Sequence, residues 1–132
     1  MIRKGDRGTG RTTLMLSAAI QVAATGRTAH VIAASKQHAG MMLAKALKLI
    51  HGTYEVNYTS ADVLLLESGG QIRFLSYKHP AVSVYPLAIE GVQNRDEIFV
   101  DHFARDCYWS EVRAANRKTQ GATVENHHPL SV

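Results

Sequence analysis

A chain of 132 residues is long enough to bury one hydrophobic core and too short for two ordinary domains, so we expect a single domain over residues 1–132. Its 45% hydrophobic and 20% charged residues are typical of globular proteins and exclude wholesale disorder. The formal charge of +4 favours anionic partners such as nucleotides or nucleic acid, although a plain basic protein has the same balance. Cys107 is the single cysteine, and no apolar run is long enough to span a membrane, so we expect a cytoplasmic protein without a membrane partner.

The stretch Lys4–Thr13 (KGDRGTGRTT) matches the pattern of a phosphate-binding loop. Gly5, Gly10 and the hydroxyl of Thr12 fit the Walker A template Gly-x-x-x-x-Gly-Lys-[Ser/Thr], with Arg11 at the lysine position. Glycines suit such a loop because its backbone N–H groups must approach the phosphates closely. The alternative is a glycine-rich turn that caps a core helix. The expected phosphate contacts are Gly5, Gly8, Thr9, Gly10, Arg11, Thr12 and Thr13.

Helical and extended patterns then alternate. Residues 12–25 predict a largely apolar helix that stops at Gly26, and its positive end would face the phosphates. Residues 28–34 are typical of a buried strand, and Ser35 is a suitable N-cap for a helix over residues 36–50.

From Thr53 the hydrophobic period changes to two. Residues 54–58 alternate, and residues 62–66 and 71–77 predict a hairpin that turns at Gly69-Gly70. The stretch 78–89 is either a short edge strand or a loop.

An apolar run, Ile98–Val100, ends on Asp101 in the manner of a strand at the carboxyl edge of a parallel sheet. A carboxylate there could hold magnesium opposite the hydroxyl of Thr12, and the alternative is a strand that simply ends on a polar residue. Residues 106–118 predict a third helix, and residues 119–132 predict at best one short strand and a frayed end.

This order of parts resembles the front half of the RecA-like ATPase core of phage terminase large subunits and related helicases. The resemblance rests on Gly5–Thr13, on the hairpin DVLLLESGGQIRFLSY and on Glu-Gly-x-x-x-x-Asp-Glu-Ile-Phe-Val-Asp, and covers roughly residues 4–106. It implies an α/β fold, a three-layer P-loop domain with a mostly parallel central sheet and a β-hairpin insertion. It also implies ATP and Mg²⁺ as cofactors, with Thr12 and Asp101 at the metal.

The chain departs from that family at three points. Arg11 replaces the loop lysine, His102 stands where hydrolytic members carry a glutamate, and the chain stops where further core strands would follow. Asp101 and His102 are the candidate catalytic residues, with Glu90 and Glu97 as alternative carboxylates. Nucleotide binding is therefore better supported than hydrolysis, and a homo-oligomer or partner subunit would have to supply any missing strands.

The resulting hypothesis is an ATP- and magnesium-binding protein of phage or bacterial DNA transactions, located in the host cytoplasm if phage-encoded. The alternatives are a degenerate, non-hydrolysing binding or assembly module and a small kinase in which Arg113 and Arg117 clamp the phosphate. DNA, if it binds, should be held through its phosphates by basic residues outside the nucleotide site. These are Lys36, Lys45, Lys48, Arg113, Arg117 and Lys118.

Overall fold

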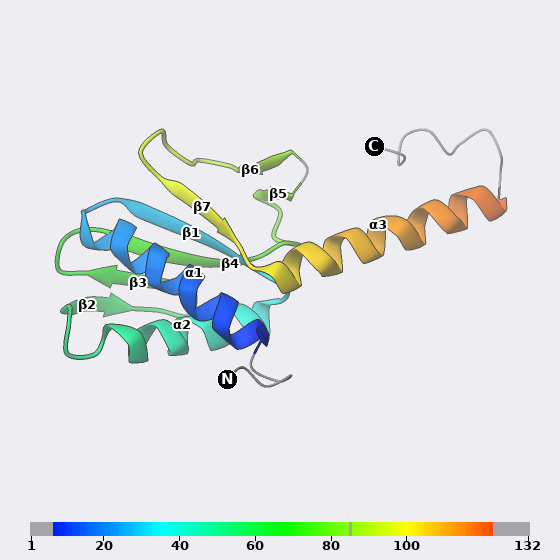
Figure 1. Ribbon diagram of the computed structural model, residues 1–132. Helices are drawn as coiled ribbons and strands as arrows, with labels where there is room; N and C mark the ends of the chain where they lie inside the picture. The colour runs from blue at the N-terminus through cyan, green and yellow to red at the C-terminus, as the bar shows by residue number, and fades with distance from the viewer. Residues whose placement is uncertain (1–6, 85, 123–132) are drawn as a thin grey trace.

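The computed structural model describes residues 7–84 and 86–122, so the expectations for Gly5 and for the tail beyond Ala122 lie outside the described residues. The chain forms an α/β domain from which one long helix extends (Figure 1). The helices are α1 (Arg7–Ala24), α2 (Lys36–Ile50) and α3 (His102–Ala122). The strands are β1 (Thr28–Ala33), β2 (Val56–Thr59), β3 (Val63–Leu66), β4 (Gln71–Ser76), β5 (Val82–Val84), β6 (Leu87–Ile89) and β7 (Glu97–Val100).

Two local signals in the sequence fix helix ends as expected. Gly26 adopts φ 87°, which favours glycine, and its N–H donates to the carbonyl of Ala23 at 3.0 Å, ending α1. Ser35 caps α2 because its Oγ accepts the N–H of His38 at 3.0 Å. These predictions are confirmed.

The expected mostly parallel RecA-like sheet is wrong. The main sheet has the order β2-β3-β4-β1-β7, in which β1 pairs in parallel with β4 and β7, while β2 with β3 and β3 with β4 are antiparallel. The reason is the hairpin of β3 and β4, whose short turn can connect only antiparallel strands. It was expected as an insertion, but β3 and β4 join the main sheet and take part in three of its four strand pairs.

Two helix starts and one connecting stretch differ from what the sequence predicted. α1 begins at Arg7, so Gly8–Arg11 is helical where a loop was expected before a helix from Thr12. α3 begins at His102, four residues before the expected start, because Asp101 caps it. Residues 78–89, expected as either a short edge strand or a loop, contain a two-stranded antiparallel ribbon of β5 and β6.

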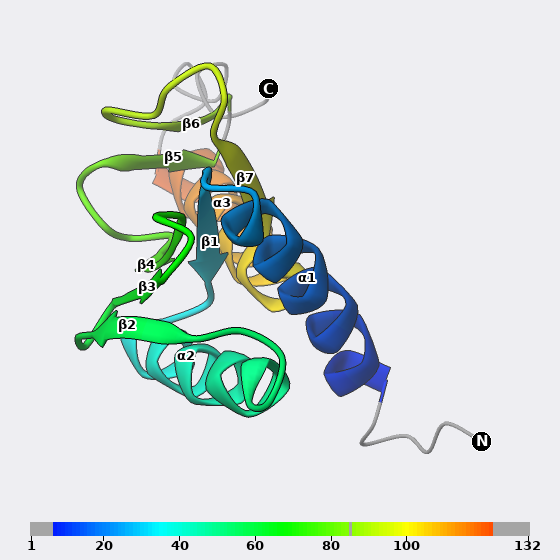
Figure 2. The ribbon, with the colours of Figure 1, turned by 90° about the vertical axis from the view of Figure 1, so that its left-hand side faces the viewer.

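The sheet has two differently covered faces (Figure 2). We call the side under α1 and α2 the helical face, and the side under the β5–β6 ribbon and α3 the ribbon face. The helical face holds the larger core, which includes Leu16, Ala23, Val31, Met42, Leu64, Ile72 and Phe74. The ribbon face holds a smaller cluster of Ile32, Leu75, Tyr77, Ile89 and Ala104.

Two contacts tie distant segments to this frame. At the turn between β3 and β4, a Cβ on Gly70 would overlap the carbonyl of Ala23, so only glycine lets the turn reach the end of α1. Near the other end of the sheet, the hydroxyl of Tyr77 donates to Glu111 at 2.7 Å, and Lys78 pairs with the same carboxylate at 3.2 Å. Glu111 thereby anchors the middle of α3, whose remaining length projects beyond the sheet (Figure 1).

Candidate functional site

The candidate site lies at the carboxyl edge of β1 and β7, which run side by side in parallel. Asp101 follows β7 directly, and Thr12 faces it from α1. The hydroxyl of Thr12 donates to Oδ1 of Asp101 at 3.0 Å, although the two residues are 89 positions apart in the chain. The structure therefore brings together the two residues that the sequence nominated for a metal.

Asp101 is 2% exposed and makes several further hydrogen bonds. Its Oδ2 accepts the N–H of Phe103 at 3.1 Å, and its own N–H donates to the carbonyl of Ile32 at 2.9 Å. Asp101 is therefore also the N-cap of α3, which satisfies one of the free N–H groups at the start of that helix. The carboxylate nominated for a metal therefore also has a structural role at the start of α3.

A cavity of about 240 Å³ opens beside this pair. Its walls come from α1, α2 and the start of α3, and consist of Thr12, His38, Met41, Met42, Lys45, Asp101 and Phe103. His38 and Lys45 give this cavity basic groups opposite the buried carboxylate.

Three of these residues, His38, Met41 and Lys45, were not expected at the site. These residues stand at helical spacing along α2, so the pattern showed that they share one face. It did not show that this face turns toward Thr12, because that depends on how α2 packs against α1. The sequence thus showed that these residues share a helix face, but not which part of the molecule that face contacts.

The other expected phosphate contacts lie along the first turns of α1. Gly8, Thr9 and Gly10 belong to the helix, and Arg11 is exposed. In an α-helix each N–H donates to the carbonyl four residues earlier, so the N–H groups of Thr12 and Thr13 are hydrogen-bonded within the helix. The N–H groups that lack an acceptor within the helix are those at its start, from Arg7 to Thr9.

His102, the candidate base, stands next to Asp101, with its Nδ1 3.8 Å from Oδ1 of that carboxylate. Its ring lies 4.1 Å from the ring of Phe103, centroid to centroid. The alternative carboxylates are elsewhere: Glu97 begins β7 at the opposite edge of the sheet, where it pairs with Arg27 at 3.1 Å, and Glu90 is exposed after β6. Asp101 is thus the carboxylate that lines this cavity.

Arg113, one of the two arginines of the kinase hypothesis, is not brought to the site. It is exposed on α3 and its guanidinium lies 3.4 Å from the hydroxyl of Ser110. At a rise of about 1.5 Å per residue it stands roughly 17 Å along the helix from His102.

The donor set at Thr12 and Asp101 fits magnesium. Mg²⁺ prefers oxygen ligands, holds them at about 2.0–2.1 Å in an octahedron, and usually takes only one or two from the protein. Two adjacent ligands of such an octahedron are roughly 2.9 Å apart, close to the 3.0 Å between the two oxygens here. Within the described residues no group of three or more His, Cys, Asp or Glu is placed to hold a metal, so phosphate and water would have to supply the remaining ligands.

No family model, curated protein or solved structure matches this chain. Across the part of the chain that the structure describes, no helix combines the length and apolar character needed to cross a membrane.

Proposed function

We propose that the chain binds ATP with Mg²⁺ at the carboxyl edge of β1 and β7, in the service of phage or bacterial DNA transactions. The observation that carries the proposal is the hydrogen bond between Thr12 and Asp101. It joins a hydroxyl from a Walker A pattern to the carboxylate that ends an apolar strand, and these are the groups that hold Mg²⁺ in phosphate-loop proteins.

The phosphates would lie between the start of α1 and the cavity beside Thr12. The first-turn N–H groups of α1 and the positive end of its dipole favour an anion there. Arg11 and Lys45 add positive charge, the first from the surface of α1 and the second from the cavity wall. Bound Mg²⁺ would neutralise part of the phosphate charge, while Thr12 and Asp101 fix its place.

Hydrolysis by this chain is proposed to be weak or conditional. His102 is the titratable side chain next to Asp101. A general base must reach the attacking water within about 3 Å, directly or through one further water. A ring that packs on Phe103 would have to turn to meet that requirement.

A second candidate is a non-hydrolysing binding or assembly module. It is favoured by the N-cap bond of Asp101, because a carboxylate that stabilises α3 is useful to the fold without any metal. In that case ATP or ADP would bind without turnover, or the Thr12–Asp101 contact would serve stability alone.

DNA is proposed as a partner through phosphate contacts. Lys36 and Lys48 on α2 and Arg113 on α3 are exposed and available for this. Binding of this kind should weaken steeply with salt and show little sequence preference. Titration of duplex and single-stranded DNA from low to physiological salt tests it, and no binding at low salt would leave the nucleotide as the sole proposed partner.

Calorimetry with ATP and ADP, with and without Mg²⁺, followed by phosphate-release assays with and without DNA, tests the nucleotide proposal. We expect Mg²⁺-dependent ATP binding and slow phosphate release. Arg11→Ala should weaken binding by about 1.5–3 kcal/mol, as for a lost hydrogen bond to a charged group. Unchanged affinity in the folded variant would remove Arg11 from the site.

A matched pair of substitutions isolates the hydroxyl at the metal. Thr12→Ser keeps an oxygen for Mg²⁺ and should retain Mg²⁺-dependent binding, whereas Thr12→Val should lose the dependence on Mg²⁺. His102→Glu should raise turnover if a carboxylate is what the site lacks. Rapid hydrolysis by the wild type would show that the catalytic group has been misplaced.

A further inference from the structure

A second, strongly polar pocket lies at the opposite, amino edge of the sheet. It has a volume of about 330 Å³ and opens on the ribbon face, where the chain between β6 and β7 passes over the starts of β1 and β4. Three arginines from three different segments line it, namely Arg27, Arg73 and Arg95. It is separate from the Thr12–Asp101 cavity, since β1 alone separates the two edges by roughly 17 Å at about 3.3 Å per residue.

The back of this pocket is a chain of hydrogen bonds that contains two nearly buried polar side chains. Nε2 of His30 lies 3.0 Å from Oδ2 of Asp96, and the side chains are 3% and 11% exposed. Nη1 of Arg73 lies 3.4 Å from Nδ1 of His30. Because a guanidinium can only donate, Nδ1 accepts from Arg73 and the proton is on Nε2, facing Asp96.

These polar groups occupy positions that a covered sheet face normally gives to apolar residues. On the ribbon face, Thr28 and His30 of β1 stand beside Gln71 and Arg73 of β4 in register, while Ile32 and Leu75 continue the same rows as core. A buried histidine and aspartate cost desolvation free energy that apolar side chains would not. Stability alone therefore does not account for the polar half of this face, as it would for Ile32 and Leu75.

The charges around the pocket are arranged for an anion. Asp96 is its one lining carboxylate against three guanidiniums, and Gln93 donates its N–H to Asp96 at 3.1 Å. Arg27 is held at the rim by Glu97 at 3.1 Å and by the hydroxyl of Thr25 at 3.0 Å. Arg95 lines the pocket and is exposed to solvent. Allowing for Asp96 and Glu97, the lining keeps a surplus of positive charge.

We propose that this pocket, lined by Arg27, Arg73 and Arg95 and backed by the His30–Asp96 pair, is a second binding site that takes the phosphate group of a small phosphate monoester. The paired N–H groups of an arginine guanidinium match two oxygens of a phosphate group. A phosphate monoester offers three such oxygens and close to two negative charges. A cavity of about 330 Å³ exceeds inorganic phosphate and lies at the lower end of the usual range for small-molecule sites, roughly 300–1,000 Å³. The His30–Asp96 pair holds Arg73 in place from behind.

The test is a titration of the whole chain with inorganic phosphate and with glycerol 3-phosphate at constant ionic strength. The readout is the side-chain NMR signals of the arginines and the imidazole signals of His30. We expect saturable shifts at Arg73, Arg95 and His30, with glycerol 3-phosphate bound at least as tightly as phosphate. Arg73→Gln and Arg95→Gln should each weaken binding about tenfold, the loss expected for a hydrogen bond to a charged group.

Three comparisons make the result decisive. Arg105→Gln, which removes an exposed arginine on α3 outside the pocket, should leave the affinity unchanged. Asp101→Asn should also leave it unchanged, which separates this site from the proposed nucleotide site. If Arg73→Gln disturbs the fold through its contact with His30, the affinity of Arg95→Gln still tests the proposal.

Several outcomes would overturn the proposal. They are an absence of saturation, shifts that centre on the start of α1, or an equal loss of affinity in Arg105→Gln. Equal binding of succinate would show a general anion site without preference for phosphate. Binding of duplex or single-stranded DNA through these arginines, with no binding of glycerol 3-phosphate, would make the pocket part of a nucleic-acid surface.

Discussion

The two edges of the sheet each hold an aspartate that is largely removed from water, but they surround it differently. Asp101 receives one hydroxyl and one backbone N–H, both neutral donors. Asp96 is hydrogen-bonded to the ring of His30 and to the backbone N–H of Gln93, and it lies among arginines. The carboxyl edge thus hydrogen-bonds its carboxylate to neutral donors, whereas the amino edge places its carboxylate among arginines.

This difference has a consequence for ionisation. Burial by itself would raise the pKa of Asp96, but the hydrogen bonds from His30 and Gln93 and the positive charge of Arg95 outweigh it, so the pKa lies below its ordinary value of 3.8. Residue type alone does not assign a function to an aspartate at a sheet edge. The neighbours that packing supplies give the two aspartates their different surroundings.

The largest expected effect on stability comes from His30→Ala at the amino edge. It removes a buried ring and leaves Asp96 without its main side-chain partner, so urea denaturation should show a loss of about 3 kcal/mol. His51→Ala, an exposed histidine after α2, should change stability by no more than about 0.5 kcal/mol. Equal small effects would mean that the His30–Asp96 pair contributes little to the fold.

At the carboxyl edge, Asp101→Ala should cost about 2 kcal/mol, because the N–H of Phe103 loses its cap and Thr12 its acceptor. Asp101→Asn should cost less, since its oxygen can face Phe103 while its NH₂ donates to Thr12. Both variants should lose Mg²⁺-dependent nucleotide binding. If Asp101→Asn retains it, the carboxylate has the structural role only.

The acid side of the stability curve distinguishes the two edges further. Since the folded pKa of Asp96 is lowered, its contribution is fully present well above 3.8 and is lost as the pH falls through the lower folded value. Asp96→Asn should flatten that part of the curve in denaturation experiments from neutral pH downward. The exposed Asp106→Asn should leave its shape unchanged, and a parallel curve for Asp96→Asn would contradict the assignment.

The smallest effect is expected where α3 is anchored near the carboxyl edge. Burial, the hydrogen bond to Glu111 and the charge of Glu111 raise the pKa of Tyr77 to about 12. Its contribution to stability is present below the ordinary pKa of 10.0 and is lost as the pH rises through about 12. Glu111→Gln should lower this pKa part of the way toward 10.0, because burial remains.

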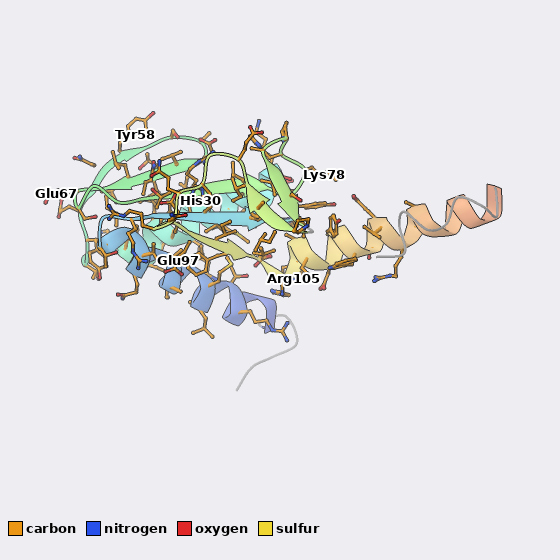
Figure 3. The ribbon with its side chains drawn as sticks, turned by 90° about the horizontal axis from the view of Figure 1, so that it is seen from above. His30, Tyr58, Glu67, Lys78, Glu97 and Arg105 are labelled. Atoms are coloured by element: carbon orange, nitrogen blue, oxygen red, sulfur yellow. The ribbon has the colours of Figure 1, made fainter. Side chains whose placement is uncertain are left out.

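Tyrosinate absorbance, assigned with Tyr77→Phe, measures that shift. Glu67→Gln is the matched control, because Glu67 lies in the turn at the far end of the sheet from Lys78 (Figure 3). An unchanged pKa in Glu111→Gln would show that burial alone raises the pKa of Tyr77.

The sequence by itself determined most of the elements, because their signals are local. Gly26 and Ser35 set helix ends, the Ser68–Gly70 turn set the hairpin, and Ile98–Asp101 set the last strand. The nomination of Thr12 and Asp101 as a pair also came from the sequence, and the structure places them in contact. Its assignment of ATP and Mg²⁺ to that pair stays a prediction.

Only the tertiary structure decided where the hairpin pairs, which residues join each edge, and which faces meet. The predicted strands put Thr28 and His30, and likewise Gln71 and Arg73, two positions apart, but the sequence did not show that β1 and β4 lie in register or that the chain after β6 returns over them. The sequence also did not show that His38 and Lys45 lie on the same cavity as Thr12. Sheet order and helix rotation depend on contacts between residues far apart in the chain, which local periodicity does not encode.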